Sequence, residues 1–103
     1  MPVVVTAVFR PAPGRHADLV DALAQTMPGV HAEPGCLLYA IHDADDGTIT
    51  MIEKWASAED LDAHGSGEAV AALQAATADL LAEPVHVVKM SPIPAGDPAA
   101  GEL

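Results

Sequence analysis

Residues 51–64 read Met-Ile-Glu-Lys-Trp-Ala-Ser-Ala-Glu-Asp-Leu-Asp-Ala-His, and this stretch decides the fold. Side chains alternate along a strand, so Met51, Glu53 and Trp55 are expected to share one face. Ser57 then supplies a hydroxyl that caps the free N–H groups of a helix. The stretch therefore predicts a strand that passes directly into a capped helix.

This junction brings the only Trp of the chain close to a histidine. Leu61 and His64 are three residues apart and therefore lie on one helical face. We expect the strand-borne Trp55 and the helix-borne His64 to line opposite walls of one pocket.

The rest of the chain extends this pattern to six elements. Pro28 is expected to kink or end the first helix, which continues for one turn at most, and residues 65–67 (Gly-Ser-Gly) interrupt the second. Strands are predicted over residues 2–10, 36–42, 48–55 and 85–90. The first helix is predicted over residues 15–32, and the second, interrupted helix over residues 57–64 and 68–83. The order strand, helix, strand, strand, helix, strand is that of a ferredoxin-like α+β fold with antiparallel strands.

The chain is expected to form one domain over residues 1–90, followed by a tail over residues 91–103 that is rich in Pro and Gly. Both helices of such a fold cover one face of the sheet. The strands carry apolar side chains on both faces, and the first strand is predicted to be central and buried on both. The uncovered face therefore predicts a homodimer that packs sheet against sheet.

The strongly negative net charge of the chain excludes some classes of binding partner. The 103 residues include 4 Lys and Arg against 15 Asp and Glu, a formal net charge of −11. Such a chain repels phosphate backbones and anionic lipid surfaces, so neither nucleic acid nor a membrane is an expected partner. Cys36 is the only cysteine, and no basic leader or long apolar run is present, so we expect a cytoplasmic protein.

Three segments together resemble a known family. They are residues 33–39 (Glu-Pro-Gly-Cys-Leu-Leu-Tyr), residues 53–57 (Glu-Lys-Trp-Ala-Ser) and residues 61–64 (Leu-Asp-Ala-His). Their sequence and spacing are similar to those of the antibiotic biosynthesis monooxygenase domain. This group of dimeric α+β barrels includes quinol monooxygenases and anthrone oxygenases, and the resemblance extends over about residues 3–90.

The resemblance implies a monooxygenase without a cofactor that oxidises a small aromatic substrate with molecular oxygen. An electron-rich quinol or anthrone, once deprotonated, can give an electron to oxygen without flavin or metal. The protein must then bind a flat apolar ring, remove a proton and exclude water. A neutral histidine is suited to accept that proton near pH 7.

His64 is the first candidate for the base, although a histidine at a helix end also interacts with local carbonyl groups. Glu53 lies within an apolar strand, where it either has a raised pKa and acts as an acid or base, or pairs with a cation such as Arg10 across the sheet. His86 either enters the cavity or is a hydrogen-bonded core residue. Trp55 and Tyr39 are expected to shape the substrate pocket or simply to pack.

Leu61 is expected to contact the substrate beside His64. The five histidines are too scattered to predict a metal site. Relatives that degrade haem carry Asn, Trp and His where this chain has approximately Ala7, His64 and Gln74, so haem degradation is not implied. Two alternatives stay open on the same fold: a binding protein for apolar ligands without catalysis, and an isomerase that does not consume oxygen.

Overall fold

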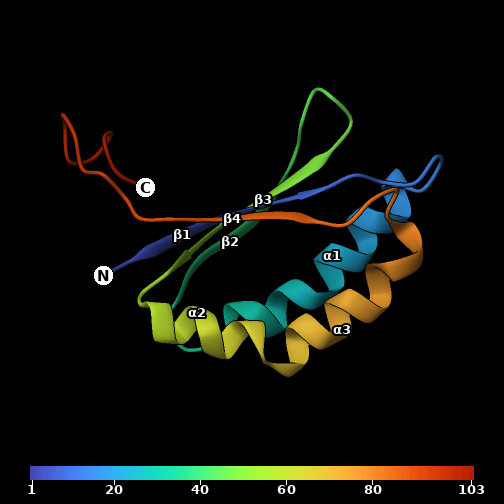
Figure 1. Ribbon diagram of the computed structural model, residues 1–103, viewed down its shortest axis with the longest axis horizontal. Coiled ribbons are helices and arrows are strands. Elements are labelled where there is room, and N and C mark those ends of the chain that lie inside the picture. The colour runs from blue at the N-terminus through green and yellow to red at the C-terminus, as the bar shows by residue number, and fades with distance from the viewer.

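The computed structural model describes all residues, 1–103, and shows one sheet with helices on one side (Figure 1). The four strands are antiparallel and lie in the order β2-β3-β1-β4, so that β1 is central. The bounds are β1 Val3–Phe9, α1 His16–His31, β2 Cys36–Asp43, β3 Ile49–Trp55, α2 Ala58–Gly65, α3 Glu68–Thr77 and β4 His86–Met90. This confirms the predicted ferredoxin-like α+β fold.

Helix α1 runs through its proline. Of the two outcomes expected at Pro28, an end or a further turn at most, the structure shows the further turn, and α1 continues to His31. Proline removes only its own N–H, and the N–H of Ala32 donates to the carbonyl oxygen of Pro28 at 3.2 Å. Val30 is fully buried, so packing against the core holds the last turn in place.

Helix α3 is shorter than predicted. It ends at Thr77 and passes through a 3₁₀ turn over Ala78–Leu80, whereas the sequence pattern predicted helix to residue 83. The cause is tertiary: the N–H of Ala12 donates to the carbonyl oxygen of Leu80, and the N–H of Ala82 donates to that of Arg10, both at 2.8 Å. These bonds draw the chain after Leu80 alongside the end of β1.

Strand β2 begins with an irregularity that the alternating pattern did not predict. Cys36 pairs with Trp55, but Leu38 already pairs with Lys54, so Leu37 is an extra residue in the ladder. In a regular strand Leu37 would share a face with Tyr39, but here Leu37 is exposed while Tyr39 is buried. After the bulge the register places Tyr39 opposite Glu53.

The core lies between the sheet and the helices. From the sheet it includes Val5, Ala7, Phe9 and Met51, and Leu19 and Leu23 of α1 pack against them. No helix covers the opposite, open face (Figure 1). The prediction that β1 is central is confirmed, but its burial on both faces is incomplete in a single chain, because Thr6 and Val8 on the open face are only half-buried.

The C-terminal tail contains neither helix nor strand. A turn around Asp97 receives the N–H groups of Ala99, Ala100 and Gly101. The Lys54 ammonium group, which lies on the open face of the sheet, donates to the carbonyl oxygen of Leu103. None of the helices combines the length and apolar character needed to cross a bilayer.

Gly35 sits at the turn between α1 and β2 with a φ of +78°, a conformation that favours glycine. A Cβ added there would lie 2.1 Å from Oδ2 and 2.7 Å from Cβ of Asp60, which is anchored on α2. We expect Gly35→Ala to lower the free energy of unfolding by about 2 to 4 kcal/mol, from backbone strain and overpacking together.

Urea unfolding measures this effect, with Gly29→Ala as the matched control. Gly29 lies inside α1 and a Cβ there meets nothing within 4 Å. We therefore expect that control to stabilise the protein by roughly 0.5 to 1 kcal/mol. Equal stability of the Gly35→Ala variant and the unaltered protein would contradict the predicted clash.

Candidate active site

A cavity of about 350 Å³ lies between the helix-covered face of the sheet and helices α2 and α3. Ala7 has the smallest side chain of the cavity floor and lies between Val5 and Val87. It reaches the surface beside the edge strand β4, where Val87 and Lys89 are exposed. The volume is within the range of small-molecule sites.

Strand register brings the polar groups of the floor into one row. Tyr39 pairs with Glu53, Glu53 with Val5, and Val5 with Lys89, so these four residues cross the whole sheet on one face. Neighbouring strands are about 4.8 Å apart. All four residues line the cavity, which therefore has a phenol and a carboxyl group at one end and an ammonium group at the other.

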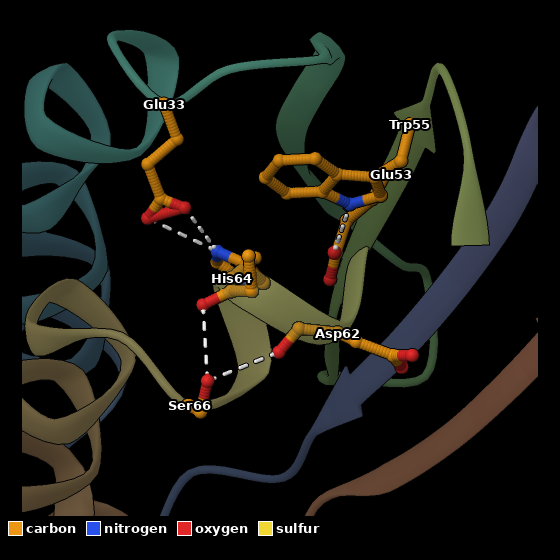
Figure 2. A network of polar contacts seen from close by, with 7 residues as sticks. Glu33, Glu53, Trp55, Asp62, His64 and Ser66 are labelled. Atoms are coloured by element: carbon orange, nitrogen blue, oxygen red, sulfur yellow. Dashed lines mark hydrogen bonds and ion pairs between the residues drawn. The ribbon is translucent and has the colours of Figure 1, made fainter. Parts of the chain in front are cut away.

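His64 enters the same cavity from α2. Ser57 accepts a hydrogen bond from the N–H of Asp60 at 3.1 Å, which confirms the predicted cap and fixes where the helix starts. Leu61 and His64 are both buried and both line the cavity, as their spacing predicted. The Nδ1 atom of His64 lies 2.8 Å from Oε2 and 3.2 Å from Oε1 of Glu33 (Figure 2).

Of the two alternatives for Trp55, the structure shows the packing role. Its side chain is fully buried and does not line the cavity, so it is not a wall opposite His64. Instead the indole packs against the imidazole with ring centroids 4.5 Å apart and an interplanar angle of 31°. Its Nε1–H donates to Oε1 of Glu53 at 3.0 Å (Figure 2). Trp55 therefore supports both candidate catalytic side chains from behind.

Burial governs the titration of the two acidic groups on the cavity floor. Desolvation raises the pKa of Glu53, although the Trp55 hydrogen bond and nearby His64 oppose part of this effect. Desolvation also raises the pKa of Tyr39, and the nearby carboxyl groups of Glu53 and Glu33 add to it. The alternative that Glu53 pairs with Arg10 is wrong, because Arg10 pairs with Glu83 at 3.1 Å.

The raised pKa of Glu53 predicts a pH-dependent stability. The folded chain keeps the Glu53 proton to higher pH than the unfolded chain does. The stability that this protonated group contributes to folding is therefore fully present below the ordinary pKa of 4.5, and it is lost as pH rises through the folded pKa. Glu53→Gln removes the titrating group, and with it this loss of stability at higher pH. The amide keeps an oxygen that accepts the hydrogen bond from the Trp55 indole N–H. We expect the variant to gain stability over the unaltered protein as pH rises from 4 to 7, measured by urea unfolding.

The matched control is Glu102→Gln, which removes the same charge from an exposed tail residue. It reports the effect of net charge alone. A Glu53→Gln variant whose advantage is the same at both pH values would contradict the raised pKa.

The structure does not bring His86 to the cavity. It pairs with Val8, on the open face of the sheet, and is exposed. His16 and His42 are exposed as well, bonded to Asp43 and to the Thr50 carbonyl oxygen. Of the predicted site residues, the cavity wall therefore unites His64, Glu53, Tyr39 and Leu61, with Trp55 behind them, and leaves His86 apart.

Glu33 is the functional candidate that sequence reasoning missed. It was interpreted only as part of a turn, although it begins one of the segments that carried the family resemblance. Its partner His64 is 31 residues away in the chain. A carboxyl group preceding Pro34-Gly35 was the available signal, but only the packing of the turn against α2 shows the contact. No cluster of three or more His, Cys, Asp or Glu side chains is arranged to hold a metal ion.

Comparison with known proteins identifies the family. The family model described as antibiotic biosynthesis monooxygenase matches residues 2–76, from β1 to α3. The chain belongs to the antibiotic biosynthesis monooxygenase family. The match contains Glu33, Tyr39, Glu53, Trp55 and His64.

A relative of this monooxygenase family member is similar to it in sequence and structure over nearly the whole chain. The Mycobacterium tuberculosis protein named "Putative monooxygenase Rv0793" is 31% identical over 93 residues, covering 89% of this chain and 92% of the relative. The solved structure of Rv0793 has a TM-score of 0.86 at 28% identity, and the match covers 94% of this chain and all of that one. These similarities support a monooxygenase-like, oxidoreductase function.

A second solved structure extends the similarity to another organism. PA3566 from Pseudomonas aeruginosa is 27% identical with a TM-score of 0.77, over 86% of this chain and 91% of that one. The two chains therefore share most of their fold.

Proposed function

We propose that this protein is a cofactor-independent monooxygenase that oxidises a small, electron-rich aromatic compound of the quinol or anthrone kind with molecular oxygen. The observation that carries the proposal is a buried histidine with one nitrogen held by a carboxyl group, facing a mainly apolar cavity. Membership of the monooxygenase family supports the reaction class.

The proposed reaction begins with the transfer of a proton from the substrate to His64. A substrate O–H or activated C–H bond breaks as a new N–H bond forms on His64, which leaves an electron-rich anion in the cavity. The anion reduces oxygen by one electron, and the two radicals combine to form a carbon–oxygen bond and a peroxide anion. The imidazolium returns its proton to that anion, and loss of water from an anthrone-type peroxide leaves the carbonyl product.

Glu53 is suited to a second role in this scheme. Because burial raises its pKa, its neutral form persists to higher pH and donates a hydrogen bond to a substrate oxygen. One of its oxygens already accepts from Trp55, which fixes the orientation of the carboxyl group. Tyr39 contributes the face of its ring and a phenol that stays protonated.

Oxygen uptake with a panel of reduced quinones and anthrones tests the function. We expect consumption above the autoxidation blank. Ala7→Leu, which fills the cavity floor, should abolish it, whereas Ala24→Leu on the exposed side of α1 should not. Uptake equal to the blank across the panel would overturn the oxygenase. Turnover of the panel without oxygen consumption would favour the isomerase, and thermal stabilisation by ligand alone would favour the binding protein.

We also propose that two copies pack through the open faces of their sheets. Apolar side chains on this face support the proposal, including Leu38, Ile52, Val88 and Met90. Val88 and Met90 are more than one-third exposed in the single chain. Light scattering at micromolar concentration tests it, since a monomer there would contradict a sheet-to-sheet dimer.

A further inference from the structure

A second hollow lies behind the histidine. This outer cleft is lined by small and acidic residues, including Glu33, Asp60 and Glu68. His64 is the one residue that lines both the substrate cavity and the outer cleft. The imidazole therefore forms part of the partition between an apolar hollow and a polar one.

The partition gives the two ring nitrogens different environments. Nδ1 is engaged by both oxygens of Glu33, while Nε2 makes no hydrogen bond within the chain. The His64 side chain is 7% exposed and that of Glu33 is 22% exposed. The carboxyl group thus keeps contact with water through the outer cleft, whereas the imidazole is almost enclosed.

We propose that Glu33 is the positioning residue of the site: it holds the proton of neutral His64 on Nδ1, leaves Nε2 as the nitrogen that accepts the substrate proton, and stabilises the imidazolium that results. The inference rests on the proposed function for the identity of the substrate, but the pairing itself serves any reaction that uses His64 as a base.

The position of Glu33 bears on both the tautomer of neutral His64 and the stability of its charged form. A neutral imidazole carries its proton on one of its two nitrogens, and hydrogen-bond partners of the ring decide which one. A hydrogen-bond acceptor beside Nδ1 selects the Nδ1–H form. When the substrate proton arrives, the N–H bond forms at Nε2, and the positive charge of the ring lies beside the carboxyl group of Glu33, which lines the outer cleft. Glu53 has no such contact with the outer cleft, which explains why the two carboxyl groups have separate roles.

Packing makes the geometry rigid. The Trp55 indole packs against one side of the imidazole (Figure 2). The Tyr39 ring meets the imidazole edge-on, with ring centroids 5.5 Å apart. Gly35, two residues after Glu33, brings the turn against Asp60 at the start of α2. The turn and the helix are therefore locked together beside the Glu33–His64 pair.

Two measurements on the full chain test the proposal. Long-range proton–nitrogen NMR spectra at alkaline pH report the tautomer of His64 without any substrate. We expect the Nδ1–H form in the unaltered protein and in Glu33→Asp, and a shift toward the Nε2–H form in Glu33→Ala. An unchanged tautomer in folded Glu33→Ala overturns the proposal.

Steady-state oxygen uptake separates the charge of Glu33 from its shape. Glu33→Gln keeps an acceptor oxygen but loses the charge, so we expect kcat to fall by about tenfold or more, with KM within about twofold, because the interaction is made chiefly in the charged state. Glu33→Asp should recover part of that loss. Wild-type kcat in Glu33→Gln overturns the stabilising role.

Glu68→Gln is the matched control, because Glu68 lines the same outer cleft and is exposed. It should change neither the tautomer nor kcat. Thermal unfolding of each variant establishes that it is folded. If no panel compound drives oxygen uptake while the tautomer shifts as expected, the oxygenase function fails and the positioning role of Glu33 is supported.

Discussion

Replacing His64 by glutamine is expected to lower kcat for oxygen uptake by about 10²- to 10⁴-fold, the usual contribution of a general base. Glutamine fills much of the same space and can still hydrogen-bond to Glu33, but it does not accept a proton near neutral pH. In this variant the substrate can lose its proton only to water or hydroxide, which gives the substrate anion much more slowly. Oxygen-electrode measurements at saturating substrate give kcat directly.

His86→Gln is the control for this variant, since the structure places His86 on the other face of the sheet. We expect its kcat to remain within about twofold of the unaltered protein. A loss of activity in His86→Gln with none in His64→Gln would reverse the assignment of the base. Activity retained in both variants would direct the search for the base to Glu53.

Replacing Trp55 by alanine is expected to lower the free energy of unfolding by about 3 to 5 kcal/mol, as for other large aromatic residues in cores. Trp55 is the largest of the fully buried side chains. Its loss also removes the N–H donor to Glu53 and the surface against which His64 packs. Because whole domains have only about 5 to 15 kcal/mol of stability, this is a large fraction.

Urea unfolding at a fixed protein concentration measures the loss, since assembly would make stability depend on concentration. Trp55→Phe separates the two contributions, because it keeps an aromatic ring but leaves the buried Glu53 oxygen without its donor. We expect it to cost about 1 to 3 kcal/mol. An alanine variant with an unchanged urea midpoint would contradict the role of Trp55 in the core.

The sequence predicted those features that depend on local pattern. The Ser57 cap, the shared face of Leu61 and His64, and the succession of strands and helices along the chain all follow from periodicity and capping chemistry. The family resemblance, carried by three short segments, was also correct. These are relations between residues that are neighbours in the chain or on one element.

The features it did not predict depend on contacts between elements. Alternation along β4 places His86, Val88 and Met90 on one face, but it does not reveal that this face points away from the helices. For Trp55 the sequence predicted the face of the strand but not the depth of burial, so it did not decide between a pocket wall and a packing role. The Glu33–His64 pair joins a turn to a helix that only the folded chain brings together.

The two edges of the sheet differ in a way that bears on self-association. Exposed edge strands attract further strands because their N–H and carbonyl groups are unpaired. On one edge, the extra residue Leu37 interrupts the regular spacing of β2 and discourages such pairing. The other edge is the short strand β4, where Lys89 places a charge at the mouth of the cavity. Lys89, which lines the cavity, thus also discourages a further strand from pairing with this edge.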